Sequence, residues 1–219
     1  MKNAKPWPPE ILKIITSNQY LTQDIWDSFR NRHFENATFN IPELGLYNAS
    51  LLESAKLIIK MIWRYNEAAG AKIRGLKSTI PIPEKYLSIH IRAGDKRKEK
   101  QIYEVENYMK IAVQLDISKN IFVLTYDYQI IREMKVNYPD WNFLTLCHPS
   151  ENGYVHSEFI QLDKREKFYR HLKLMANIDI CASSEKFIGT YSSGPGSYLA
   201  MRKGEEQCFG IDYNSWVMW

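Results

Sequence analysis

A histidine, an arginine and a Gly-Asp-Lys turn follow a short apolar run in the segment His90-Ile91-Arg92-Ala93-Gly94-Asp95-Lys96. The run Tyr86-Leu87-Ser88-Ile89 predicts a strand, so the cationic side chains come at the carboxyl end of that strand. A guanidinium such as that of Arg92 holds two phosphate oxygens through parallel donors and stays charged at any working pH. The segment therefore predicts a diphosphate site. The alternative is a structural salt bridge between Arg92 and Asp95.

Two further apolar runs are each followed by polar residues of types that contact nucleotides. Leu124-Thr125-Tyr126-Asp127 makes Thr125 and Asp127 candidate nucleotide contacts, although Asp127 is equally suited to cap the helix that follows. Thr190 to Gly196 combines serine hydroxyls with the start of a helix, which is typical of phosphate binding and also of a plain capping turn with Ser193 or Ser197 as the cap. The carboxyl ends of parallel strands meet at one edge of a sheet, so the three segments are expected to converge.

The elements that must position these segments alternate between helix and strand from residue 87 onward. Such alternation predicts an α/β fold with a Rossmann-like parallel sheet. The predicted strands are Leu87–Ile91, Asn120–Thr125, Trp141–Leu146, Lys186–Thr190 and Glu206–Ile211, and the predicted helices are Val105–Leu115, Tyr128–Tyr138, Arg165–Ser183 and Gly196–Arg202.

The part of the chain before the first predicted strand has a different pattern. Residues 9–32 predict two short helices, and Asn48 to Ala69 predicts one amphipathic helix that closes at Gly70. No strong strand pattern precedes residue 87. We therefore expect two parts. Residues 1–83 would form a small, mostly helical part that contributes to a possible acceptor side of the site, and residues 84–219 would form a nucleotide-binding domain.

Composition sets the class of protein. The chain has 219 residues, of which 45% are apolar, and a formal charge of +4, which suits an anionic ligand but is too weak to indicate nucleic acid. The basic run at residues 96–100 is more typical of a solvated loop. Three well-separated cysteines and the histidine spacing favour neither disulfides nor a metal site. Without a secretory signal or an apolar span, the expected location is the cytoplasm.

Together the three segments resemble the donor-binding half of the fucosyltransferase superfamily that includes α-1,6-fucosyltransferases, nodulation fucosyltransferases and protein O-fucosyltransferases. Residues 90–96 are similar to its His-x-Arg-x-x-Asp-Lys signature, residues 121–139 to its next strand and helix, and residues 187–193 to its third motif. The likeness covers roughly Leu87 to Arg202. It implies a glycosyltransferase of GT-B type.

The resemblance implies a GDP-sugar donor, GDP-fucose in the first place, held without a metal ion or other cofactor. It implies transfer of the sugar to a glycan hydroxyl with inversion at the anomeric carbon. Arg92 would neutralise the β-phosphate, and Glu99 resembles the general base. The donor pocket would be formed by His90, Asp95, Lys96, Thr125, Asp127, Asp179, Ser192 and Ser193, with Asn177 as the alternative to Asp179 and Tyr191 as a candidate for stacking on the base or the sugar.

Two departures keep other functions open. Many relatives have a second arginine and a glutamine where this chain has Ala93 and Gly194. These differences make another nucleotide-sugar donor credible. The short amino-terminal part also suits a non-catalytic module that binds a sugar nucleotide or a glycan.

Overall fold

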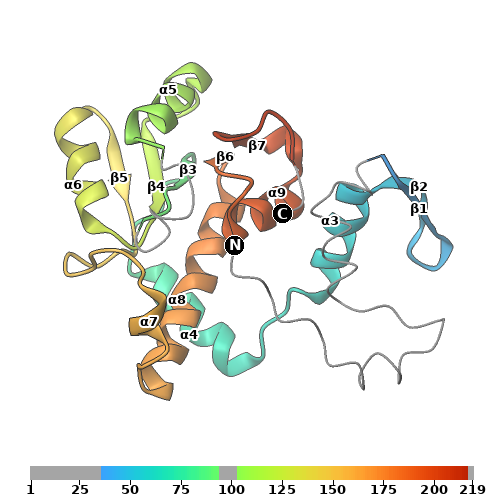
Figure 1. Cartoon of the computed structure of the whole chain (residues 1–219), viewed down its shortest axis with the longest axis horizontal. Coiled ribbons are helices and arrows are strands. Elements are labelled where there is room, and N and C mark those ends of the chain that lie inside the picture. The colour runs from blue at the N-terminus through green and yellow to red at the C-terminus, as the bar shows by residue number, and fades with distance from the viewer. Residues whose placement is uncertain (1–35, 94–102, 217–219) are drawn as a thin grey trace, which may run out of the picture.

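A parallel five-stranded sheet forms the centre of the protein (Figure 1). The structure is a computed structural model and describes residues 36–93 and 103–216. The strands lie in the order β5-β4-β3-β6-β7, and each neighbouring pair is parallel. Their bounds are Leu87–His90 for β3, Asn120–Leu124 for β4, Asn142–Leu144 for β5, Lys186–Gly189 for β6 and Cys208–Gly210 for β7.

The order in which the chain adds strands to the sheet reverses at β3. The chain runs from β3 through β4 to β5 on one side, then returns to place β6 and β7 on the other side. Ser88 of β3 is paired with Phe122 of β4 and with Phe187 of β6. Ligands of open α/β sheets bind at such a reversal, outside the carboxyl ends of the strands. The fold thus favours a site between the ends of β3 and β6.

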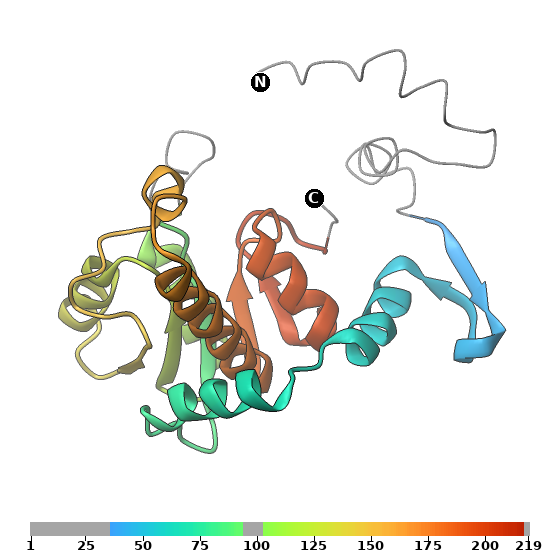
Figure 2. The same ribbon diagram turned by 90° about the horizontal axis from the view of Figure 1, so that it is seen from below.

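Helices cover both faces of the sheet (Figures 1 and 2). Ile121 and Val123 of β4 pack with α5 (Val105–Leu115) and α6 (Tyr128–Asn137). Phe122 and Leu124 of the same strand pack instead with α8 (Lys164–Ser183) and α9 (Gly194–Lys203). Alternate residues of β4 therefore serve two apolar cores, which explains why the run from Ile121 to Leu124 is apolar throughout.

The predicted α/β class with a Rossmann-like parallel sheet is confirmed. Every helix and strand predicted from residue 87 onward is present, with ends within two residues of those predicted. In the described ranges, no helix has the length and apolar character needed to cross a bilayer. All three cysteines are buried and unpaired.

The amino-terminal part differs from the prediction. A hairpin of β1 (Thr38–Ile41) and β2 (Leu46–Ser50) precedes the helices, around a 3-10 turn at Pro42–Leu44. Gly45 ends that turn with a φ of 69°, in the left-handed region that glycine tolerates best. Only Ala49 of the strand residues is buried, and the polar–apolar alternation of β1 covers just its four residues, which is too short to stand out as a strand.

The single helix predicted over residues 48–69 is also wrong, because the chain forms two helices there. α3 (Leu51–Ile62) begins with a capping box between Ser50 and Glu53, and α4 (Glu67–Ser78) begins where the Asn66 side chain accepts from Ala69 N. α3 packs against α9, and α4 packs against α8 (Figure 2). The domain boundary between residues 83 and 84 stays a prediction.

Candidate functional site

The first motif emerges at the predicted strand end. His90 is the last residue of β3 and is buried, whereas Arg92 follows it and is half-buried. The backbone stays paired for one more residue, since Ile91 N donates to Leu124 O at 3.1 Å. This bond holds the end of β3 beside the end of β4.

A side-chain contact links the first motif to the third across the sheet reversal. His90 Nδ1 lies 3.3 Å from Ser193 Oγ. The Ser193 hydroxyl donates to Thr190 O at 2.8 Å and accepts from Gly196 N at 3.1 Å. A hydroxyl has one proton and two lone pairs, so we assign its second lone pair to a proton on His90 Nδ1. His90 Nε2 is then an acceptor.

The turn before α9 is fixed by its own hydrogen bonds. Ser193 is the N-cap of α9, and Gly196 packs so closely on Thr190 O that a side chain there would clash. The carboxylate of Asp212 accepts from Tyr191 N at 2.8 Å and from Ser192 N at 2.9 Å. The sequence did not single out Asp212, which lies just after β7 and prevents these two amides from turning to a ligand.

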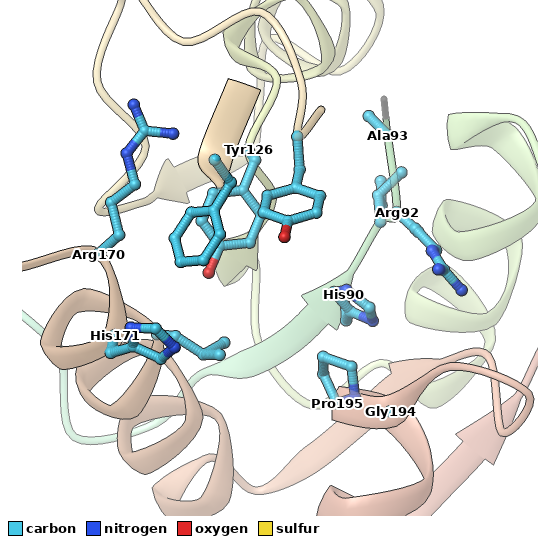
Figure 3. A pocket seen from close by; sticks show the side chains of 12 residues that line it. His90, Arg92, Ala93, Tyr126, Arg170, His171, Gly194 and Pro195 are labelled. Atoms are coloured by element: carbon cyan, nitrogen blue, oxygen red, sulfur yellow. The ribbon is translucent and has the colours of Figure 1, made fainter. Parts of the chain in front are cut away.

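A cavity of about 280 Å³ opens beside these strand ends (Figure 3). It brings together residues of the first motif, Tyr126 of the second motif, and the two residues that follow the third motif at the start of α9. The other lining residues come from α7 (His156–Phe159), α8 and the loop before α7. The residues that line it are His90, Ile91, Arg92, Ala93, Tyr126, Tyr154, Phe159, Arg170, His171, Leu174, Gly194 and Pro195. Its volume is close to the lower end of small-molecule sites.

The cavity favours an anionic ligand. Arg92 and Arg170 both line it, and no acidic side chain is found among its described lining residues. Burial and, to a smaller extent, the nearby Arg92 lower the pKa of His90 to about 4, so His90 is neutral near pH 7. His90 therefore adds no positive charge to that of the two arginines.

The remaining residues of the second motif have structural roles. Thr125 is buried, and its Oγ1 accepts from Asp127 N at 3.2 Å. Asp127 is the N-cap of α6 and accepts from Gln129 N at 3.0 Å, as its alternative interpretation predicted. Neither lines the cavity. Tyr126, between them, does.

Tyr191 and Asp179 are directed away from the cavity. Tyr191 is buried in the core, where its hydroxyl donates to Cys208 O at 3.0 Å. Asp179 accepts from Arg202 at 2.7 Å, from Tyr65 at 3.2 Å and from Trp63 at 3.4 Å. These contacts join α8 to α9 and to the α3–α4 connection, which is a structural role that spacing along the chain does not reveal.

Asn177, the alternative to Asp179, is buried and donates through Nδ2 to Lys173 O in its own helix at 2.8 Å. It does not line the cavity. Neither Ser192 nor Ser193 lines the cavity. The backbone amide of Ser192 donates to Asp212, and Ser193 contacts His90, which does line it. Asp95, Lys96 and Glu99 lie outside the described residues, so their assignments stay predictions.

The aromatic and cationic lining opposite Arg92 was missed by the sequence analysis. Tyr154 lies in the loop before α7 and Phe159 is the last residue of that short helix, in a stretch with no regular apolar pattern. Arg170 and His171 lie on a helix rich in other charged residues. The one available signal was Tyr126, which sits between two residues that had been selected.

A stability effect follows from the low pKa of His90. The folded pKa of about 4 lies below the ordinary 6.5, so the unfolded chain takes up the proton first as the pH falls. The stability associated with neutral His90 is complete above pH 6.5 and is lost toward pH 4. Urea unfolding is expected to show that protonation of this residue lowers the free energy of unfolding by about 2 kcal/mol between pH 7 and pH 5.

Two variants test this prediction. His90→Asn should lack that part of the loss, and His171→Gln should retain it. Equal losses in wild type and His90→Asn would contradict the assignment.

No protein family model matches this sequence, and no curated protein matches it. Among residues 36–93 and 103–216, no group of three or more histidine, cysteine, aspartate or glutamate side chains is arranged to hold a metal ion.

Proposed function

We propose that this protein is an inverting glycosyltransferase that moves fucose, or a related sugar, from a GDP-sugar to a glycan hydroxyl. The observation that carries the proposal is the contact between His90 and Ser193, which joins the first and third motifs at the sheet reversal. Arg92 and Gly194 line the same cavity there. Arg92 follows β3, and Gly194 is the first residue of α9. This pairing of an arginine with a helix start suits a diphosphate, because both the side chain and the helix end attract negative charge.

The chemistry of transfer explains why such a site is useful. The acceptor oxygen forms a bond to C1 of the sugar while the bond from C1 to the β-phosphate oxygen breaks. The electron pair of the broken bond leaves with GDP, and the proton of the acceptor hydroxyl passes to a carboxylate, for which the resemblance suggests Glu99. Arg92 stabilises the charge that develops on the departing diphosphate.

A thermal-shift experiment with GDP and UDP tests this proposal. A ligand at 100 times its Kd stabilises a folded protein by about 2.7 kcal/mol, which for this chain length corresponds to a rise in Tm of roughly 5–10 °C. We expect that rise with GDP and a smaller one with UDP, followed by release of GDP when a GDP-sugar and a glycan acceptor are supplied.

Three outcomes would overturn the proposal. Stabilisation by UDP alone would indicate another nucleotide-sugar donor. Stabilisation by GDP without turnover on any acceptor would indicate a binding module. The absence of any response to either nucleotide would remove the nucleotide site.

A further inference from the structure

The side of the cavity opposite Arg92 is an aromatic wall made by Tyr126, Tyr154 and Phe159. The ring centroids of Tyr126 and Tyr154 are 6.3 Å apart, and those of Tyr154 and Phe159 are 5.7 Å apart. His171 continues the series, 5.5 Å from Phe159. Figure 3 shows Arg170 and His171 on one side of Tyr126 and His90 with Arg92 on the other. Planar aromatic side chains of this kind stack on nucleobases.

The wall is held in place by the loop that carries it. Gly153 N donates to Tyr126 O at 2.6 Å, and Tyr128 N donates to Glu151 O at 2.9 Å, so the loop is paired with the segment that joins β4 to α6. Glu151 also forms an ion pair with Lys173, which is buried in α8. Backbone pairing and a largely buried ion pair indicate a prearranged surface.

Arg170 presents unused donors at this end of the cavity. Its Nε donates to Glu166 Oε1 at 3.0 Å, one turn earlier on α8, which orients the side chain. Its Nη groups have no hydrogen-bond partner within the part of the chain that the structure describes. The guanidinium lines the cavity together with the aromatic wall. The two Nη groups of Arg170 therefore offer a pair of hydrogen-bond donors beside the aromatic wall.

We propose that the aromatic wall binds the base of the nucleotide and that Arg170 makes the site selective for guanine. This inference rests on the proposed function, which places the diphosphate at Arg92. Guanine has two neighbouring acceptors, O6 and N7, that match two parallel donors of an arginine. Adenine presents an amino donor in place of O6, and uracil has no N7, so neither pairs with both donors. The residue set differs from the one the resemblance implies, because Tyr154, Phe159 and Arg170 lie outside all three motifs.

The test is a calorimetric titration of the full chain with GDP, ADP and UDP. Wild type should bind GDP about 10- to 100-fold more tightly than ADP. In Arg170→Gln the GDP preference should fall to about 3-fold or less, or reverse toward ADP, because a glutamine amide pairs with N6 and N7 of adenine. Arg165→Gln is the matched control, since it removes an exposed arginine of the same helix that does not line the cavity. It should keep the wild-type preference.

The outcomes separate this inference from the proposed function. If Arg170→Gln retains the full preference for GDP, while wild type binds GDP and transfers sugar, guanine recognition by Arg170 is wrong and the transferase remains. If the preference depends on Arg170 but no acceptor is glycosylated, the base site remains and the transferase is wrong. If wild type binds none of the three nucleotides, both are overturned.

Discussion

Replacement of Arg92 by alanine is expected to lower the rate of sugar transfer by about 100-fold or more. Arg92 lines the cavity beside Gly194, at the start of α9, and no described residue forms an ion pair with it. The alternative partner, Asp95, lies outside the described residues. Removal of a donor that stabilises developing charge in a preorganised site costs a large part of the rate. The measurement is the steady-state rate of GDP release with saturating acceptor.

Two companion variants make this result specific. Arg92→Lys keeps the charge but loses the planar fork, so it should fall between wild type and Arg92→Ala. Arg165→Ala removes a cation elsewhere and should leave the rate unchanged. Urea unfolding of each variant separates a loss of rate from a loss of stability, which is the result expected if Arg92 instead forms a structural salt bridge. A rate for Arg92→Ala close to that of wild type would refute the role assigned to Arg92.

Replacement of Gly196 by alanine is expected to destabilise the protein by about 3 kcal/mol and to weaken GDP binding. A Cβ at this position would clash with Thr190 O and would lie 2.9 Å from Ser193 Oγ. Both atoms belong to the turn that contacts His90. The backbone must shift to admit the methyl group, so the effect should appear both in urea unfolding and in nucleotide titration.

Gly194→Ala is the matched control for this prediction. A Cβ at Gly194 would meet no atom within 4 Å, although the residue is only two positions away in the same helix. Its stability should equal or slightly exceed that of wild type. Similar losses from the two substitutions would show that the close packing of Gly196 on the turn has no special importance.

Much of the α/β part from residue 87 onward was predictable because its sequence pattern follows directly from its packing. Ile121 to Leu124 faces a core on both sides of the sheet, so the run is apolar throughout and is recognised as a buried strand. Asp127 and Ser193 cap the helices that follow their strands, as their residue types suggested.

The parts that were not predicted depend on contacts between distant segments. The break between α3 and α4 places Trp63 and Tyr65 against Asp179, more than 100 positions along the chain. Asp179 therefore lies in a structural network and not at the cavity, which no local pattern indicates. The aromatic wall has the same origin, since Tyr154 reaches Tyr126 because the loop pairs with the segment that joins β4 to α6.

The most direct test of the account is a crystal structure of the protein with GDP. The account predicts the diphosphate within about 3 Å of the Arg92 guanidinium, at the start of α9, with the base against Tyr126 and its acceptor edge toward Arg170. GDP bound away from the ends of β3 and β6, or Arg92 without a contact to either phosphate, would contradict it.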